Sequence, residues 1–351
     1  MPRSTHSPRS ASSTSPARSK QYAAFGAVAL IGAAVAAAWW LGVPDTAEYE
    51  ARLPRAPVPA AEPTRDSATL LFVGDIMLDR GIDAIMRRRD DWIFPFRRMQ
   101  PLLREADLLI GNLEGPISDQ GTNVGSIYSF RADPRAIEGL VAAGFDILSV
   151  ANNHIWDYGP DAARDTLTRL GQAGIAPVGG GVDVAEAHAP VMRTINGVRI
   201  ALLAYTDLLP ESRGAADASP AIAYLDPAIV RADIAAARQN ADVVIVMLHW
   251  GNEYEPHPTA AQRALARVLI AEGATLVIGH HPHVVQDIER VGEGLIAYSL
   301  GNFVFDQNFS PETSRAIALR VMLDRGGLAG WQALPIRFTA AFEPYPATTT
   351  P

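Results

Sequence analysis

Three histidines within five residues are the densest group of reactive side chains in the chain, in the segment GHHPH at 279–283. The apolar run 274–278 precedes them and is typical of a buried strand. Histidine is the commonest neutral metal ligand, and His281 and His283 lie on one side of an extended backbone, with His280 on the other. The segment therefore predicts two imidazole ligands of one metal centre, and a solvated polar loop is the alternative.

Four other polar clusters follow apolar runs in the same way. They are Asp75 after 69–73, Asn112 and Glu114 after 107–110, Asn152, Asn153 and His154 after 146–150, and His249 after 242–248. A lone histidine at such a place is more often structural, so His249 gains its weight from the other clusters. Ligands of open α/β sheets bind outside the carboxyl ends of the strands, which makes five clusters there a prediction of one composite site. Carboxylate, amide and imidazole groups without a thiolate suit Mn, Fe or Zn.

The clusters suggest separate roles for their members. Asp75 is the natural first metal carboxylate, and a helix cap or turn is its alternative. Asn112 and Glu114 are two residues apart and point to one side of an extended backbone, although both could belong to a capping loop. Asn153 offers an amide oxygen to a metal, which leaves the adjacent His154 free for acid–base work.

Other polar and aromatic residues are candidates for supporting roles. Asp157 or Asp146 could orient the His154 imidazole, and Asp157 could equally cap the following helix. Arg80 could bind an anionic substrate group or be a solvated helix charge. Trp250 could form an aromatic wall for a substrate, or belong to the core.

Composition limits the class of protein. The chain has 351 residues, of which 48% are hydrophobic, enough for one large domain or two small ones. It has no cysteine, which excludes disulfides, thiolate metal sites and cysteine nucleophiles. The net charge is −8 and the first 20 residues carry +4, which leaves −12 on the remainder. An acidic main domain argues against nucleic acid as a partner.

An uncharged apolar segment at residues 22–43 predicts a membrane anchor, because a bilayer is spanned by roughly 20 apolar residues. Basic residues before it and acidic residues after it place the N-terminus in the cytoplasm and the main domain outside, in a single-pass protein of the cell membrane. A cleaved signal peptide is the alternative. We expect a basic disordered tail at 1–21, the anchor at 22–43, a Pro-rich linker at 44–66, the main domain at 67–337 and a tail at 338–351.

Strands alternate with helical patterns through the main domain. Apolar residues recur at helical spacing in 134–143, 160–173, 227–239 and 259–272, and 198–205 and 295–300 supply further strands. This alternation predicts an α/β fold with a mixed or mostly parallel sheet.

Seven motifs, in this order, resemble the CapA family of capsule-synthesis or poly-γ-glutamate biosynthesis proteins. They are GDIML at 74–78, GNLE at 111–114, FRADP at 130–134, ANNHIWDYG at 151–159, HWGNEYEP at 249–256, GHHPHVVQ at 279–286 and SLGNF at 299–303. The resemblance covers residues 69–306. The family is similar to the calcineurin-like metallophosphoesterases, which implies a four-layer α/β/β/α sandwich with one or two divalent metal ions at the strand ends.

The resemblance also implies roles at the first two strand ends. Asp75 matches the first Asp of the phosphoesterase Asp-x-His motif. Met77 stands where that motif has its histidine, which implies one ligand fewer. Asn112 and Glu114 occupy the place of the Gly-Asp-x-x-Asp motif, and either could take the bridging place.

The remaining matches lie in the later motifs. Asn153 and His154 match Gly-Asn-His, as ligand and proton donor respectively. His249 matches the isolated strand-end histidine. His281 and His283 match the Gly-His-x-His pair, shifted by one residue.

These features predict a membrane-anchored, metal-dependent hydrolase of the cell envelope that acts in capsule or poly-γ-glutamate biosynthesis. Bound metal would lower the pKa of a water toward ~7, and His154 would protonate the leaving atom. The substrate would be an anionic phosphoester or the amide of an anionic polymer. The alternative is a non-catalytic, metal-binding accessory subunit beside integral-membrane polymer synthase subunits. A nucleotidase in which Trp250 stacks on a base is a third reading.

Overall fold

Two β-sheets form the centre of the protein in a computed structural model that describes residues 66–209 and 219–347. The first sheet has the order β16 (Pro344–Pro346), β15 (Gly327–Phe338), β14 (Arg315–Asp324), β1 (Ala68–Ile76), β2 (Leu108–Leu113), β3 (Ile147–Ser149) and β4 (Ala176–Val178), with β13 (Asn302–Val304) also paired to β1. The second has the order β11 (Ile288–Val291), β12 (Gly294–Ala297), β10 (Leu276–His280), β9 (Val243–His249), β7 (Val198–Thr206) and β6 (Val191–Ile195). The short strands β5 (Gly180–Gly181) and β8 (Ala221–Ile222) pair separately.

The centre of each sheet is parallel. β1 through β4 run parallel in the first sheet, and β7, β9, β10 and β12 do so in the second. These strands are apolar without interruption because both of their faces are covered. Their carboxyl ends therefore carry the polar clusters of the sequence.

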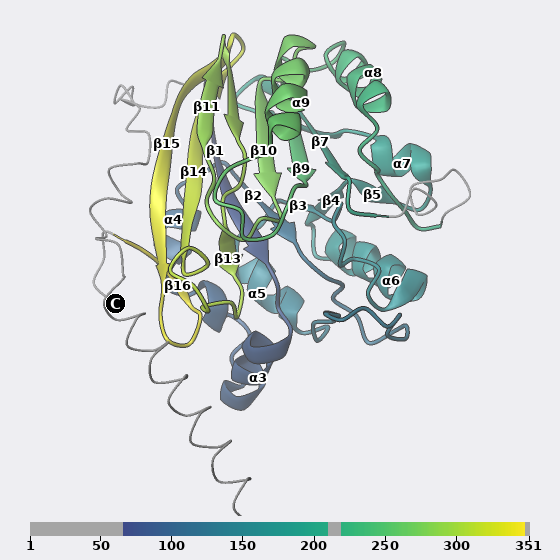
Figure 1. Ribbon diagram of the computed structural model, residues 1–351, viewed down its shortest axis with the longest axis vertical. Coiled ribbons are helices and arrows are strands. Elements are labelled where there is room, and N and C mark those ends of the chain that lie inside the picture. The colour runs from purple at the N-terminus through teal and green to yellow at the C-terminus, as the bar shows by residue number, and fades with distance from the viewer. Residues whose placement is uncertain (1–65, 210–218, 348–351) are drawn as a thin grey trace, which may run out of the picture. The chain divides into compact units, whose positions relative to one another are not determined.

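Helices cover the outer faces of both sheets. They are α3 (Arg80–Arg89), η1 (Phe94–Phe96), α4 (Gln100–Leu103), α5 (Ala136–Ala143), α6 (Gly159–Gln172), α7 (Val184–His188), α8 (Pro227–Ala237) and α9 (Ala260–Ala271). One core cluster joins inward residues of β7 and β9 to the first sheet and to α5 and α6. A second cluster joins the outward residues of β7 and β9 to α8 and α9. The described residues thus form a mixed α/β sandwich, with layers in the order helices, sheet, sheet, helices (Figure 1).

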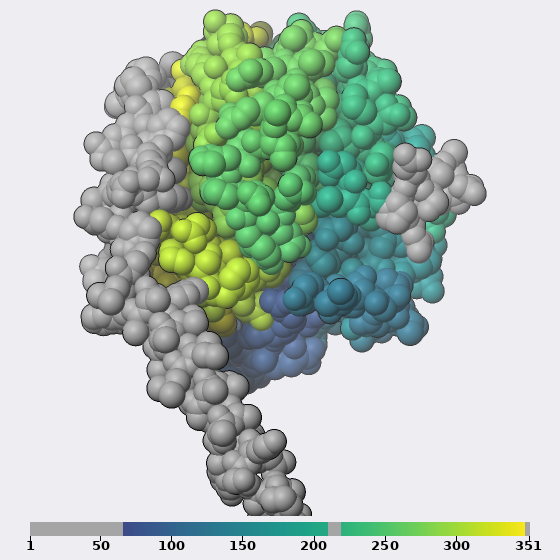
Figure 2. All heavy atoms as spheres, in the orientation of Figure 1, coloured from purple at the N-terminus to yellow at the C-terminus, as the bar shows by residue number. Residues whose placement is uncertain are grey.

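Segments far apart in the sequence lie side by side in this sandwich. β13 pairs with β1 although more than two hundred residues separate them. On the face shown in Figure 2, the purple-blue surface of the first described residues adjoins the green and yellow-green surface of much later ones. The fold therefore brings residues of both halves of the sequence together.

The four helices expected from apolar spacing are confirmed as α5, α6, α8 and α9. α9 begins with a complete capping box, in which the Thr259 side chain accepts from the Gln262 backbone and the Gln262 side chain accepts from the Thr259 backbone. α6 and α8 have proline in their first turn, where the missing N–H has no intrahelical partner to lose.

The sheet continues past residue 337, the predicted end of the domain. β15 ends at Phe338, and β16 then pairs with it, Pro346 opposite Ile336. Proline is tolerated here because β16 is an edge strand, where a missing N–H breaks no ladder on its free side. The predicted tail therefore begins later than residue 338.

Residues 1–65 lie outside the described part of the chain, and with them the predicted cytoplasmic tail, the anchor at 22–43 and nearly all of the linker. Within residues 66–209 and 219–347, no helix is long and apolar enough to cross a bilayer.

Candidate metal centre

The polar clusters at the strand ends meet where the two sheets adjoin. Asp75 of β1 lies opposite Asn112 of β2 and Asn302 of β13, while His249 of β9 lies opposite His280 of β10. Glu114 follows β2, and His281 and His283 follow β10. Figure 1 shows β1, β2, β9 and β10 together in the middle of the described residues. The side chains of this set are almost fully buried.

Two glycines allow the backbones to approach each other just before the ligands. A Cβ at Gly74 would lie 1.8 Å from the Gly301 carbonyl oxygen, and one at Gly279 would lie 1.9 Å from that of Tyr298. No side chain fits at either position. Gly74 is therefore the residue at which β1 comes into close contact with the segment before β13. Asp75 follows it within β1 and does not cap a helix.

Asp75, Glu114 and His283 form one group able to hold a metal ion, with one ligand atom of each within 4.8 Å of the others. His283 Nε2 lies 3.5 Å from Glu114 Oε1, and His283 Nδ1 lies 3.5 Å from Asp75 Oδ2. Two carboxylates and an imidazole are a ligand set suited to a hard or borderline divalent cation.

A hydrogen-bond chain orients the His283 ring. Asn302 Nδ2 donates to Gln307 Oε1 at 3.2 Å, and Gln307 Nε2 donates to the Tyr254 hydroxyl at 3.2 Å. Asn302 Oδ1 lies on the other side of this amide, 2.9 Å from His283 Nδ1. This contact at Nδ1 orients the ring, so that His283 Nε2 is the nitrogen directed at Glu114.

Asn153, His249 and His281 lie on the other side of the centre. His249 Nε2 is 2.8 Å from Asn153 Oδ1, and the rings of His249 and His281 are 4.9 Å apart. The His281 backbone N–H donates to Asp75 Oδ2 at 3.2 Å, which ties this side to β1. His280 points away, as expected, with Nε2 3.2 Å from the Val73 carbonyl oxygen.

Asn152 has an orientation that fixed backbone groups determine. Its Oδ1 accepts the backbone N–H groups of His154 and Ile155 at 3.1 and 3.0 Å. Its Nδ2 donates to the Leu113 carbonyl oxygen at 2.8 Å and to Asn112 Oδ1 at 3.2 Å. Because a carbonyl only accepts and an N–H only donates, the amide of Asn152 cannot be turned round without losing these bonds.

Asn112 is held in turn as a donor. With its Oδ1 occupied by Asn152, its Nδ2 faces Asp75 Oδ1 at 2.9 Å, Glu114 Oε2 at 3.5 Å and His249 Nδ1 at 3.3 Å. An amide nitrogen has no lone pair for a metal. This geometry corrects the predicted ligand role of Asn112 to that of a donor that positions the ligands around it.

His154 and Asp157 form a buried pair beside the centre. His154 Nδ1 lies 2.7 Å from Asp157 Oδ2, which also accepts the Phe130 backbone N–H at 2.8 Å. His154 Nε2 faces Glu114 Oε1 at 3.8 Å. Asp146 instead accepts from the Leu109 backbone, so Asp157 is the partner that orients the imidazole.

Burial and neighbouring charges shift the pKa values of three histidines and one glutamate of the centre in different directions. Burial and the neighbouring imidazoles hold the pKa of His249 well below its usual range, and burial with His283 lowers the pKa of His281 to about 3. Burial raises the pKa of Glu114 well above its usual value and the positive charge of His283 opposes this shift, so the buried pair shares a proton, which we place on His283. Burial alone would lower the pKa of His283, but the charge of Glu114 and the contact with Asp75 raise it to about 9. His249 and His281 are therefore neutral at pH 7, the form that binds a metal.

Two unsatisfied atoms show that the centre fits a cation. Glu114 Oε1 and His281 Nδ1 are buried and have no hydrogen-bond partner. Buried polar atoms without partners are uncommon and costly, and each of these two residues belongs to a group of side chains able to hold a metal ion. The backbone is strained as well, with positive φ at His281 (96°) and His283 (58°). Such strain concentrates at functional sites.

Arg80 and Trp250, the two predicted substrate-binding residues, are engaged in contacts with other parts of the protein. Arg80 forms an ion pair with Asp306 and lies over the Phe130 ring at 5.0 Å. Trp250 is 1% exposed, and its indole donates to the Tyr298 carbonyl oxygen and stacks on the Tyr298 ring. The burial of Trp250 in the core between β9 and the outer helices corrects its predicted role as an aromatic substrate wall.

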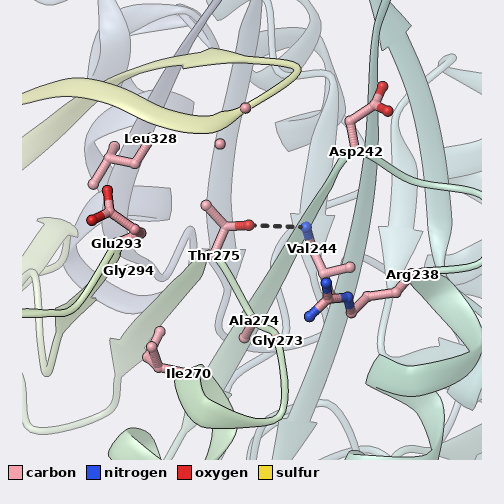
Figure 3. A pocket seen from close by; sticks show the side chains of 12 residues that line it. Arg238, Asp242, Val244, Ile270, Gly273, Ala274, Thr275, Glu293, Gly294 and Leu328 are labelled. Atoms are coloured by element: carbon pink, nitrogen blue, oxygen red, sulfur yellow. Dashed lines mark hydrogen bonds between the residues drawn. The ribbon is translucent and has the colours of Figure 1, made fainter.

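A hollow at the opposite ends of the strands contrasts with this centre. Thr275, Val244, Asp242 and Glu293 are among the residues that line it (Figure 3), and Thr275 Oγ1 accepts from the Val244 backbone N–H at 3.4 Å. Asp242 is paired with Arg199. No imidazole lines the hollow, so it has no counterpart of the candidate metal centre.

Sequence reasoning missed three residues of the centre. Asn152 and Asn302 act through hydrogen bonds to other polar side chains, and Glu253 lies beside His281 and His283. Each stands inside a motif that was recognised, and Asn152 is next to Asn153, which was assigned. Their roles depend on contacts between strands, which spacing along one strand does not reveal.

The fold and the site together define a mixed α/β sandwich protein with a candidate metal centre of imidazoles and carboxylates at the carboxyl ends of its strands. Residues 69–307 match the family model described as "Bacterial capsule synthesis protein PGA_cap", and the chain belongs to this family.

Relatives support this assignment. The chain is similar to the capsule biosynthesis protein CapA of Bacillus anthracis, with 33% identity over 277 residues, which cover 76% of this chain and 67% of that protein. It is similar to the PGA biosynthesis protein CapA of Bacillus subtilis (strain 168), with 34% identity over 275 residues, 77% and 72% of the two chains. Among solved structures it resembles the calcineurin-like phosphoesterase YfkN from Bacillus subtilis, with a TM-score of 0.43, 14% identity, and coverage of 76% and 88% of the two chains.

Proposed function

We propose that the chain is a metal-dependent hydrolase of the cell envelope that acts in capsule or poly-γ-glutamate biosynthesis. The observation that carries this proposal is the buried His154–Asp157 pair, whose free imidazole nitrogen faces Glu114 of the candidate metal centre. A centre that only stabilised the fold would need no oriented imidazole beside it. The pair has the geometry of a proton donor and its positioning carboxylate.

The residues that would hold metal are Asp75, Glu114 and His283 on one side and Asn153, His249 and His281 on the other. One or two divalent ions of Mn, Fe or Zn suit these groups. When bound, such an ion activates water near neutral pH and polarises the bond to be broken.

The chain's own side chains supply the rest of the chemistry. Asp157 accepts from His154 Nδ1 and so keeps Nε2 directed at the centre. A proton carried on His154 Nε2 can pass to the leaving atom of a substrate there. Asn112 donates to Asp75 and Glu114 and keeps both carboxylates in place.

The substrate that we propose is anionic, either a phosphoester or the amide of a carboxylate polymer. The names of the two CapA relatives refer to capsule and PGA biosynthesis, which favours the polymer. Arg80 would contribute to anion binding only if its pairing with Asp306 opened. We further propose that residues 22–43 anchor the chain in the cell membrane, with the main domain outside the cytoplasm.

A non-catalytic accessory role beside membrane-embedded synthase subunits is the second candidate. The observation that favours it is Met77, which is fully buried at the end of β1 with its sulfur accepting the Asp79 backbone N–H at 3.1 Å. Position 77 therefore supplies no imidazole to the centre.

The test compares wild type, His154→Ala and Asp75→Ala for metal content and for turnover of poly-γ-glutamate and of aryl phosphodiesters. We expect His154→Ala to keep its metal and lose turnover by about 10²–10⁴-fold. Asp75→Ala should lose both. A wild-type chain that binds metal and turns over neither substrate would favour the accessory role, and one without metal would overturn the hydrolase.

A further inference from the structure

We propose that Glu253 is a metal ligand on the solvent side of the candidate metal centre, acting with His281 and His283. The inference rests on the proposed function in that it requires the centre to hold metal. It adds a ligand that comes from the turn after β9 and lies outside the strand ends.

The first observation is the geometry of the group. One ligand atom each of Glu253, His281 and His283 lie within 4.8 Å of one another. His283 is shared with the group of Asp75 and Glu114, so Glu253 adjoins the buried carboxylates across that ring. Movements of up to about 1 Å for each side chain would bring such atoms to the separations found around a metal with bonds of about 2.1 Å.

The second observation is the unsatisfied nitrogen of His281. This residue is 5% exposed, and its Nδ1 is buried without a hydrogen-bond partner. Its backbone has a φ of 96°, a conformation that a residue with a side chain rarely adopts. The strained backbone and the unsatisfied nitrogen of His281 are both accounted for if this residue binds an ion together with Glu253 and His283.

The third observation is that the Glu253 turn is fixed to the histidine loop. The backbone N–H of Tyr254 donates to the Pro282 carbonyl oxygen at 2.8 Å. Tyr254 also has a positive φ of 63°, and its hydroxyl accepts from Gln307, which continues through Asn302 to His283. The same contacts that orient the His283 ring therefore hold the turn of Glu253 next to it.

Glu253 adds a ligand on the side of the centre that faces solvent. Asp75, Glu114 and the imidazoles come from the buried side, whereas Glu253 is exposed. Met77 offers no ligand because its sulfur is turned to the Asp79 backbone. A carboxylate at the exposed side adds charge and a hard donor where an incoming ion first meets the centre.

The test uses the full chain and Mn²⁺ as the probe. Affinity is measured by calorimetry and metal content by elemental analysis for wild type, Glu253→Gln and Glu255→Gln. Glu255 is the matched control, because it is an exposed glutamate two residues along the same turn and outside the described ligand groups. The Co²⁺-substituted forms are compared by visible absorption, which reports the ligands directly.

We expect Glu253→Gln to bind Mn²⁺ at least about tenfold more weakly, or to hold one ion fewer, and to have a changed Co²⁺ spectrum at saturation. Glu255→Gln should match wild type. Unchanged affinity and spectrum in Glu253→Gln, with wild type binding metal, would overturn this inference alone. Weaker binding with an unchanged spectrum would also overturn it, because Glu253 would then attract the ion through its negative charge without being a ligand. No metal in wild type would overturn the proposed function and this inference together.

Discussion

Asn152 Nδ2 donates to Asn112 Oδ1 at 3.2 Å, and this one bond determines which face Asn112 presents to the candidate metal centre. Backbone groups of His154, Ile155 and Leu113 fix the Asn152 amide, so Asn112 is left with its nitrogen toward Asp75. The centre is thus positioned by the amide pair of Asn152 and Asn112.

Replacing Asn152 should weaken both the fold and metal binding. Asn152→Ala leaves the backbone N–H groups of His154 and Ile155 without their acceptor, at a cost of about 1–3 kcal/mol for each group that stays unsatisfied. It also frees Asn112 to rotate. We expect a loss of about 3 kcal/mol in the free energy of unfolding and at least about tenfold weaker Mn²⁺ binding, measured by urea denaturation and calorimetry. Equal Mn²⁺ affinity in the variant would contradict the positioning role.

Asp157→Asn should impair turnover without removing metal. The substitution keeps the shape of the side chain but removes the charge that accepts from His154 Nδ1 and from the Phe130 backbone. We expect turnover to fall by about 10²-fold with metal content as in wild type. Asp146→Asn is the control, because the Asp146 side chain accepts from the Leu109 backbone N–H and is not the carboxylate that contacts His154. Similar turnover losses in both variants would show that the effect is one of folding.

Metal affinity should rise with pH between about 6.5 and 9. The metal-free centre keeps a proton on His283, because its pKa, which burial alone would lower, is raised to about 9 by Glu114 and Asp75. A metal must displace this proton, so the apparent affinity should increase by about tenfold for each pH unit and level off above 9. Calorimetry in buffers of different ionisation enthalpy counts the released proton. Affinity independent of pH across this window would contradict the placement of that proton.

Protonation of His283 also makes the stability of the metal-free fold depend on pH. A histidine whose folded pKa lies above its unfolded value stabilises the fold at pH values below about 6.5, and this contribution is lost as pH rises through 9. The metal-free chain should therefore become less stable over the interval in which metal binds more tightly. Urea denaturation of the metal-free chain at pH 6.5 and 9 measures this loss.

Gly74→Ala should be severely destabilising. The new Cβ would meet the Gly301 carbonyl oxygen at 1.8 Å, so β1 and the segment before β13 would have to separate. We expect a loss above about 3 kcal/mol in the free energy of unfolding. Gly171→Ala in α6 is the matched control, since nothing lies within 4 Å of its Cβ, and it should stabilise by about 0.5–1 kcal/mol. Equal stability of the two variants would contradict the close strand contact.

Much of the fold could be predicted because it follows from local patterns. The helices α5, α6, α8 and α9 have apolar residues at helical spacing and proline or threonine at or near their starts. The parallel strands are uninterrupted apolar runs. β14 through β16 were not predicted, since they pair antiparallel at the edge of the first sheet, and that pairing depends on residues far away in the sequence.

The sequence by itself determined which residues stand at the strand ends, because a polar residue that follows a buried strand emerges at the edge of the sheet. Asp75, Glu114, His249, His281 and His283 could be chosen on this basis. Only the tertiary structure decided what each side chain faces. Asn112 became a donor through Asn152, Trp250 turned into the core, and Glu253 came beside His283, because hydrogen bonds and packing between distant segments set these directions.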